Sequence, residues 1–323
     1  MRAVIPRRLA LLALLPLAVA PFACSSTSDT PAPAGSVPDA SAEGGPSGAV
    51  DAGDAGASFD GAALSGRPYK SFVPSKYDPS KPAPLVVLLH GYTASGDLQE
   101  SYFKLAKVAE DKTFLYAYPD GTVDARGNRF WNASSSCCNF FGAKVDDVAY
   151  VTAILDEMSA KHSVDPKRVY VVGHSNGGFM AHRMACELAG RVAAIVSLAG
   201  TLDQDTACKP AAPVAVLQVH GDADGTIAYA GGSVASGVPS FLGAREAVAF
   251  WARANGCDPT LAAGGPDLDL DTGLAGAETK VERHTCARGA AELWTLRGGA
   301  HTPPFQSDWG ARVWGFLEAH PKP

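Results

Sequence analysis

The stretch Arg168-Val-Tyr-Val-Val-Gly-His-Ser-Asn-Gly-Gly178 decides the fold. An apolar, β-branched run leads into a G-x-S-x-G pattern from Gly173 to Gly177, and Met180 and Met184 then follow at helical spacing. A strand, a sharp turn and a helix are the context of a nucleophile elbow, in which a serine sits on a strained backbone. The bare pattern is weak in a glycine-rich chain, so the prediction depends on the flanking strand and helix.

The N-terminus predicts an export signal. A start with three arginines precedes the apolar run 9–20, which has signal-peptide proportions and is too short to span a membrane. We therefore predict that residues 1–24 are a signal peptide. Small residues at 18–20 fit ordinary cleavage, whereas the surroundings of Cys24 resemble a bacterial lipoprotein signal with a lipidated cysteine. The expected location is outside the cell, either secreted or as an outer-surface lipoprotein of a bacterium.

The next segment has the composition of a linker. Residues 25–65 are mostly Ala, Gly, Ser, Pro and Asp, and such a segment cannot bury enough apolar surface to order itself. Residues 66–323 are then expected to form one catalytic domain. The net charge of -6 and the absence of a Lys/Arg cluster argue against a nucleic-acid partner. We expect a monomer.

Cysteine usage predicts disulfides. Apart from Cys24, six cysteines remain in a chain that we expect to be exported, and the sequence does not choose among their pairings. Cys257 and Cys286 bracket a Gly/Asp-rich segment and could staple its base. Cys137 and Cys138 are adjacent, so we expect each to pair with a separate partner. No second Cys or His lies at zinc-ligand spacing, so we predict neither a metal nor a cofactor.

Short apolar runs alternate with segments of helical periodicity along the domain. Strands are expected at 85–89, 114–118, 168–172, 192–198, 214–219 and 292–296, and helices at 98–109, 148–162, 241–254 and 308–319, besides the helix after the elbow. Because most of these strands are apolar throughout, they predict a mostly parallel sheet with helices on both faces. Functional groups gather at the carboxyl ends of the strands in such sheets.

Candidate carboxylates follow from that rule. A nucleophilic Ser175 needs a neutral imidazole, and the imidazole needs a carboxylate to hold its tautomer, in the chain order Ser, acid, His. The acid should follow the strand that ends at 219, where both Asp222 and Asp224 qualify and spacing cannot separate them. Asp146 and Asp147 form a second pair, at the start of a helix, where capping is favoured over acid/base chemistry.

The base must be a later histidine. His301 follows a strand and two glycines and precedes the closing helix, so a loop can fold it back over the elbow. His284 lies inside a strand-like run, and His320 is too close to the terminus to keep a catalytic geometry. His301 is therefore the predicted base. His174 and His220 are expected to have structural roles.

The oxyanion of an ester-cleaving intermediate must meet fixed donors. The backbone N–H of Asn176, directly after the nucleophile, is one candidate. The other should come from the loop after the first buried strand, where we choose the N–H of Tyr92. Gly91 makes room for the substrate to approach.

Four motifs resemble one known family. They are the Gly173–Gly178 elbow, the 220–227 loop, the segment around His301, and the Cys137-Cys138 pair, and they fall in the family's order from about Arg67 to the C-terminus. The chain is similar to the polyhydroxybutyrate depolymerase and feruloyl esterase family, carbohydrate esterase family 1 of the α/β-hydrolase superfamily. The resemblance implies an α/β-hydrolase fold with a single catalytic domain. It also implies Ser175 as nucleophile, His301 as base and Asp224, in preference to Asp222, as the acid.

The resemblance also shapes the expected function. Relatives usually carry Cys where Tyr92 stands, and a tryptophan shortly after the base, where this chain has Pro303. Trp131 matches an aromatic loop near the active site of relatives, which implies substrate binding, with core packing as the alternative. We expect a secreted serine esterase, feruloyl- or acetyl-xylan-esterase-like on plant polysaccharide. The alternatives are an extracellular polyhydroxybutyrate depolymerase and, more distantly, a serine peptidase or a non-catalytic surface binding module.

Overall fold

The computed structural model describes residues 58–64, 66–205 and 207–323. The predicted signal peptide 1–24, with its lipidation candidate Cys24, and most of the predicted linker lie outside the described residues. The described part holds a counterpart of every strand and helix that the sequence predicts, although the bounds of some of them differ.

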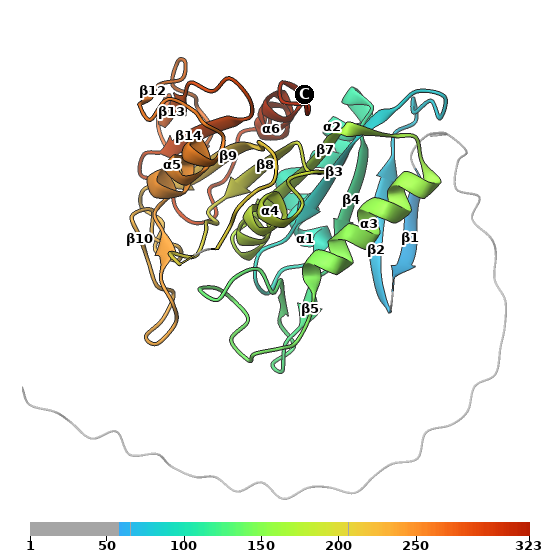
Figure 1. Cartoon of the computed structure of the whole chain (residues 1–323), viewed down its shortest axis with the longest axis horizontal. Coiled ribbons are helices and arrows are strands. Elements are labelled where there is room, and N and C mark those ends of the chain that lie inside the picture. The colour runs from blue at the N-terminus through green and yellow to red at the C-terminus, as the bar shows by residue number, and fades with distance from the viewer. Residues whose placement is uncertain (1–57, 65, 206) are drawn as a thin grey trace, which may run out of the picture. The chain divides into compact units, whose positions relative to one another are not determined.

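A ten-stranded sheet forms the centre of the described structure (Figure 1). Across the sheet the order is β1 (Ser58–Leu64), β2 (Arg67–Val73), β4 (Leu115–Pro119), β3 (Ala83–Leu89), β7 (Val164–His174), β8 (Ala194–Leu198), β9 (Ala215–Gly221), β14 (Ala290–Leu296), β13 (Thr279–His284) and β12 (Leu261–Ala263). The six strands from β4 to β14 are parallel to one another, and the two strands at each edge are antiparallel. The predicted, mostly parallel sheet is confirmed.

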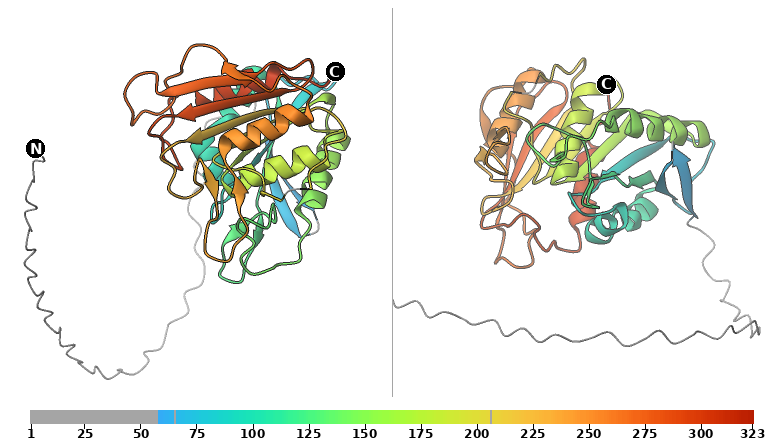
Figure 2. Two further views of the ribbon diagram at one scale, coloured as in Figure 1. Left: turned by 60° about the vertical axis from the view of Figure 1, so that its left-hand side comes forward. Right: turned by 90° about the horizontal axis from the view of Figure 1, so that it is seen from below.

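Helices cover both faces of this sheet, as Figures 1 and 2 show. One face packs against α3 (Asp147–Lys161), α4 (Asn176–Glu187) and α5 (Ala244–Ala254), and the other against α1 (Gly96–Phe103), α2 (Leu105–Lys112) and α6 (Trp309–Glu318). Side chains alternate along each strand, so Leu85 and Val87 of β3 join the first core and Val86 and Leu88 the second. None of the described helices is both long and apolar enough to cross a membrane.

The predicted helix 98–109 is wrong in detail, because the structure breaks it into α1 and α2. Lys104 takes a left-handed conformation with φ of 55° and ends α1. The Glu100 carboxylate then accepts hydrogen bonds from the backbone N–H groups of Leu105 and Ala106, at 3.1 and 2.9 Å. A side chain of the first helix therefore satisfies the free donors at the start of the second, which allows the break.

The predicted linker, residues 25–65, extends too far along the chain, because its last part forms a strand of the sheet. Residues 58–64 form β1, which pairs with β2 along its whole length, from Ser58 opposite Val73 to Leu64 opposite Arg67. Backbone hydrogen bonds to an existing sheet edge can order a segment that has few apolar side chains. Composition alone therefore placed the domain boundary too far along the chain.

Short two-stranded ladders lie outside the main sheet. The loop after β4 holds β5 (Thr122–Val123) and β6 (Arg129–Phe130), and a later loop holds β10 (Gly231–Gly232) and β11 (Phe241–Leu242). Because β11 uses the first residues of the predicted helix 241–254, that helix begins at Ala244 instead.

The carboxylates at the start of α3 have structural roles. Asp146 is the N-cap and accepts a hydrogen bond from the Ala149 N–H at 2.9 Å. Asp147 is buried and binds the Arg67 guanidinium and the Asn132 N–H, each at 2.7 Å. Asp146 thus caps α3 as expected, whereas Asp147 forms an ion pair, and the two carboxylates do not make a paired acid/base site.

Three disulfides link the six cysteines. Cys257 pairs with Cys286, one of the arrangements that the sequence left open, and Cys186 pairs with Cys208. The expectation for the adjacent pair is wrong, because Cys137 and Cys138 bond to each other. The backbone turns at Cys138 with a φ of 77°, and this turn lets the two neighbouring sulfur atoms meet.

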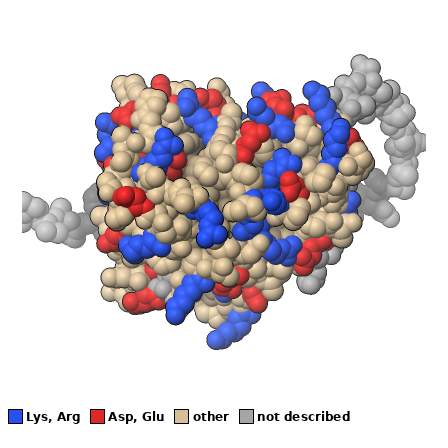
Figure 3. Space-filling model, turned by 45° about the horizontal axis from the view of Figure 1, so that its top comes forward, with Lys and Arg blue, Asp and Glu red and all other residues tan. Residues whose placement is uncertain are grey.

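Charge is mixed on the face drawn in Figure 3, where Lys and Arg side chains are interspersed with Asp and Glu. Interspersed charge does not create the strong positive field that a nucleic-acid surface needs.

Candidate active site

Ser175 lies at the tight turn between β7 and α4. Its backbone has φ of 55° and ψ of −121°, a conformation that costs free energy for a residue with a side chain. The glycines on either side make the turn possible: a Cβ on Gly173 would clash with the Gly177 carbonyl, and a Cβ on Gly177 would clash with the Leu89 carbonyl. The Ser175 N–H is held by the Leu198 carbonyl of β8 at 2.8 Å.

His301 reaches Ser175 from the loop between β14 and α6. Its Nε2 lies 2.9 Å from the Ser175 Oγ. The loop is held in place by the Tyr102 hydroxyl, which donates to the Pro303 carbonyl at 2.7 Å, and by Phe305, whose ring stacks on Trp309 with centroids 3.8 Å apart. The imidazole is therefore positioned by packing at both sides of the loop.

Asp224 completes the arrangement. Its Oδ2 lies 2.7 Å from His301 Nδ1, and its Oδ1 accepts hydrogen bonds from the N–H groups of Thr226 and Ile227 at 2.8 and 2.9 Å. Burial raises the pKa of this carboxyl, but hydrogen bonds from His220 and His301 outweigh burial and bring the pKa well below its ordinary value. Asp224 is therefore an anion throughout the neutral range.

Asp222 lies on the same loop but outside this arrangement. It is exposed, and its Oδ1 accepts a hydrogen bond from the Gly298 N–H at 2.6 Å. The structure thus brings Asp224, and not Asp222, to His301. The carboxylate of Asp222 ties the two loops that carry Asp224 and His301 together.

Four other histidines considered in the sequence contact groups other than the Ser175 hydroxyl. His284 Nδ1 bonds the Asp258 carbonyl, and His320 Nδ1 bonds the Phe316 carbonyl. His174 Nε2 donates to the His301 carbonyl at 3.1 Å and so helps to fix the backbone of His301. His220 lies against Asp224, with Nε2 3.3 Å from Oδ2.

The two residues predicted to donate to an oxyanion lie beside Ser175. A Cβ on Gly91 would sit 3.4 Å from the Ser175 Cβ, so the loop carrying Tyr92 runs next to the serine. Asn176 is the first residue of α4, where backbone N–H groups have no partner within the helix. Within the described residues, neither the Tyr92 nor the Asn176 N–H donates to another backbone or side-chain group. Both are therefore free to meet an oxyanion.

Sequence reasoning missed a second role of Asn176. Its side chain makes two hydrogen bonds to the backbone of Trp131, accepting from the N–H at 2.6 Å and donating to the carbonyl at 3.0 Å. It thereby anchors the 131 loop to the elbow helix. No local signal could have found this contact, because the two residues are 45 positions apart.

Trp131 does not line a substrate surface in this structure. Its side chain has no exposed area, its indole N–H donates to the His90 carbonyl at 3.0 Å, and its ring packs against His90 and Tyr150. The predicted substrate contact is therefore corrected to the packing alternative. The Asn176 hydrogen bonds hold the Trp131 backbone beside the start of α4, and the indole ring lies in the core.

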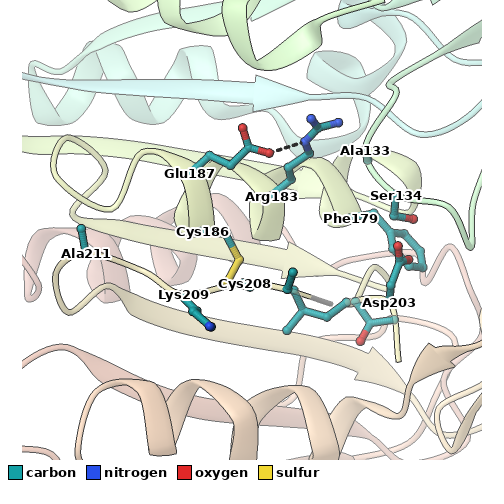
Figure 4. Close-up of a pocket in the computed structure, with 13 residues that line it drawn as sticks. Ala133, Ser134, Phe179, Arg183, Cys186, Glu187, Asp203, Cys208, Lys209 and Ala211 are labelled. Atoms are coloured by element: carbon teal, nitrogen blue, oxygen red, sulfur yellow. Dashed lines mark hydrogen bonds and ion pairs between the residues drawn. A yellow bond between two sulfur atoms is a disulfide. The ribbon is translucent and has the colours of Figure 1, made fainter. Parts of the chain in front are cut away.

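A cavity of about 600 Å³ lies between α4 and the 201–211 loop (Figure 4). Along α4, Arg183 Nε pairs with Glu187 Oε1 at 2.7 Å, and the Cys186–Cys208 disulfide ties the helix to the loop. Ser175, His301 and Asp224 are not among the residues that line this cavity. The three-residue site thus lies at the strand ends, outside this cavity.

Buried histidines should make the protein sensitive to acid. Burial lowers the pKa of both His174 and His182 from 6.5 to about 4, and the charge of His301 adds to the effect at His174. Between these values the unfolded chain binds more protons than the folded one, so stability rises with pH across this window and falls as pH is lowered. Each histidine can lower the free energy of unfolding by up to about 3 kcal/mol once the pH has fallen to about 4.

We therefore expect the free energy of unfolding in urea to be clearly smaller at pH 5 than at pH 7. Equilibrium unfolding followed by tryptophan fluorescence at the two pH values would measure it. Equal free energies at both would contradict neutral, buried His174 and His182.

Comparison with known proteins identifies the fold. A family model described as alpha/beta hydrolase fold matches residues 84–236. The chain has the α/β-hydrolase fold. The solved structure of an acetyl xylan esterase from Aspergillus awamori superposes on this α/β-hydrolase with a TM-score of 0.54 at 16% identity, covering 80% of this chain and 99% of the other. The predicted fold class is thereby confirmed.

Curated relatives of this α/β-hydrolase carry esterase names. Feruloyl esterase B of Piromyces equi is 31% identical over 254 residues, which cover 76% of this chain and 44% of the relative. Poly(3-hydroxyalkanoate) depolymerase C of Paucimonas lemoignei is 27% identical over 263 residues, covering 74% of this chain and 59% of the relative. The chain thus spans less than two thirds of either relative. Both names fall within the family that the motifs resemble, so that resemblance is confirmed.

Proposed function

We propose that this α/β-hydrolase is a secreted serine esterase that cleaves carboxylic esters through Ser175, His301 and Asp224. The observation that carries the proposal is the continuous line of contacts from Ser175 Oγ to His301 Nε2, at 2.9 Å, and from His301 Nδ1 to Asp224 Oδ2, at 2.7 Å. A hydroxyl, an imidazole and a carboxylate in this order form the unit that activates a serine.

Protonation states follow from the contacts. The anionic Asp224 can only accept, so His301 Nδ1 carries the hydrogen and Nε2 presents a lone pair to the Ser175 hydroxyl. Nε2 takes the hydroxyl proton as Oγ attacks the ester carbonyl carbon. The resulting imidazolium is stabilised by the Asp224 charge, which stays in place and takes no proton.

The carbonyl oxygen becomes negative during attack, and the backbone N–H groups of Tyr92 and Asn176 are the proposed donors to it. His301 then gives its proton to the leaving alcohol, and the C–O bond of the ester breaks to leave an acyl group on Ser175. Water attacks this acyl-enzyme with His301 again as base. The carboxylic acid is released and the Ser175 hydroxyl is regenerated.

The proposed substrates are feruloyl or acetyl esters on plant polysaccharide. This choice is supported by the family resemblance and by the feruloyl esterase among the relatives. The relative that is named a depolymerase supports polyhydroxybutyrate as the alternative substrate. Three disulfides support an oxidising compartment, so we propose that the protein is exported. A lipid anchor at Cys24 and a monomeric state are parts of the same proposal.

Product release from three matched substrates tests the assignment. We expect ferulate or acetate to appear from esterified xylan in proportion to enzyme, with the Ser175→Ala variant as the control for spontaneous hydrolysis. Release of 3-hydroxybutyrate from polyhydroxybutyrate, without either acid from xylan, would transfer the assignment to the depolymerase. Cleavage of a small aryl ester without any of the three products would remove both substrate classes and keep the esterase chemistry.

A further inference from the structure

A chain of buried polar side chains runs through the core from α5 to the Asp224 carboxylate. Trp251 Nε1 donates to His182 Nδ1 at 2.9 Å, and His182 Nε2 lies 3.0 Å from Gln218 Oε1. Gln218 Nε2 lies 3.2 Å from His220 Nδ1, and His220 Nε2 lies 3.3 Å from Asp224 Oδ2. The first four side chains have no exposed area. Burying this many polar groups is costly unless all of them are paired, and here they are paired in series.

Two groups fix the direction of the first half of this chain. An indole N–H can only donate, so His182 Nδ1 has no proton and its Nε2–H must donate to Gln218. A carbonyl oxygen can only accept, so the Gln218 atom that lies 2.7 Å from the Gly200 carbonyl must be the amide nitrogen. The orientation of the amide is therefore set by its partners.

The same reasoning fixes the tautomer of His220. The Gln218 amide nitrogen is also the atom that faces His220 Nδ1, so Nδ1 accepts and Nε2 carries the proton. The Ile227 carbonyl, 2.8 Å from Nε2, requires the same tautomer independently. The Nε2–H donates to that carbonyl, and the same nitrogen lies 3.3 Å from Asp224 Oδ2, so the protonated edge of the His220 ring faces the carboxylate.

We propose that His220 is a positioning residue for the Asp224 carboxylate, and that Trp251, His182 and Gln218 hold it in the donating tautomer. The proposal rests on the proposed function, in which Asp224 orients His301. With the opposite tautomer, His220 would turn a lone pair toward the carboxylate and repel it. With the observed one, the protonated edge of His220 lies against Oδ2, which also accepts from His301, so this tautomer favours the carboxylate position that faces His301.

The surroundings make pH dependence a useful readout. Asp224 faces His301 directly, and the His174 ring lies beside the His301 ring with centroids 5.2 Å apart. The rings of Tyr229 and His220 meet edge to face, with centroids 5.7 Å apart. Burial raises the pKa of Asp224, whereas the contact with His220 helps to lower it. Without His220 the Asp224 carboxylate keeps more of its negative charge for His301, which favours the protonated imidazole over the neutral one.

The first test compares two replacements of His220. In His220→Phe we expect kcat on a small aryl ester to fall about 10-fold to 100-fold, the range for losing a hydrogen bond to a charged group, with KM nearly unchanged. The acid limb of the kcat profile should move to higher pH. In His220→Gln the side-chain amide can donate from the place of Nε2, so most of the kcat and the original limb should return.

A role in packing alone predicts a different pattern. If His220→Phe lowers kcat without moving the acid limb, or if His220→Gln is as impaired as His220→Phe, the proposal is overturned. Trp251→Phe extends the test to the far end of the chain, since it keeps an aromatic ring and removes only the fixed donor. We expect a smaller shift of the acid limb in the same direction, and an unshifted limb would contradict the role of Trp251.

Heteronuclear NMR of histidine-labelled wild-type protein tests the chain without turnover. At about pH 7 the His220 ring should be neutral with its proton on Nε2, and the opposite tautomer or a mixture would refute the proposal. Because this readout does not need catalysis, it separates the two failures. Retained turnover in Ser175→Ala would remove the esterase mechanism, whereas the wrong tautomer would remove only the His220 assignment.

Discussion

Ser175→Ala is expected to lower kcat on a small aryl ester by roughly 10⁴-fold or more, because the variant loses the only atom that forms the acyl-enzyme. The backbone at this position keeps its strained φ of 55° with either side chain, so the fold should survive. Any residual rate would come from the oxyanion donors and from substrate binding. The measurement is steady-state hydrolysis, with thermal unfolding as the check on folding.

A matched serine strengthens this experiment. Ser233 is exposed in the loop that holds β10, and the partners of its hydroxyl, Ala235 and Val238, lie in the same loop. Ser233→Ala should therefore keep wild-type turnover. If Ser175→Ala hydrolysed the ester as fast as Ser233→Ala, the nucleophile would have to be sought elsewhere.

Asp224→Asn should have an effect of similar size, roughly 10⁴-fold in kcat. An amide can turn its nitrogen toward His301 Nδ1, and this stabilises the tautomer in which Nε2 carries the proton. His301 would then be unable to accept the Ser175 proton. Because the geometry stays intact, the loss should fall on kcat while the melting temperature changes little.

Asp222→Asn is the matched control, since it makes the same change two positions earlier on the same loop. The Asn oxygen can still accept the hydrogen bond from the Gly298 N–H, so the loop contact survives and kcat should change by a small factor. Inactive Asp222→Asn together with active Asp224→Asn would exchange their roles. Equal losses in both variants would indicate a general effect of loop disorder.

The sequence predicted the central architecture because that architecture depends on local patterns. Continuous apolar runs such as 85–89 marked the buried parallel strands, and the chain order of a serine, an acid and a base limited the candidates for each role. Spacing left Asp222 and Asp224 tied, since both follow the same strand. The family resemblance favoured Asp224, and in the structure Asp224 contacts His301 whereas Asp222 accepts from the Gly298 N–H.

What the sequence could not give depends on contacts between distant residues. The sequence suggested a substrate contact for Trp131, whereas in the structure the Asn176 side chain bonds the Trp131 backbone and the indole ring is buried. The Cys137–Cys138 bond depends on the backbone turn at Cys138, which no composition rule predicts. The sequence indicated only a structural role for His220, and it gave no signal for His182, whose partners Gln218 and Trp251 come from β9 and α5.

The Cys186–Cys208 bond joins the end of the elbow helix to the loop that follows β8, closing a 22-residue span of chain. A disulfide that closes a loop of this size lowers the conformational entropy of the unfolded chain and stabilises the folded state by about 3 kcal/mol. Protein made in a reducing bacterial cytosol would lack this link, and the helix that starts at the nucleophile would be tethered less firmly. Recombinant production for any of these assays should therefore direct the chain to the periplasm or use an oxidising host.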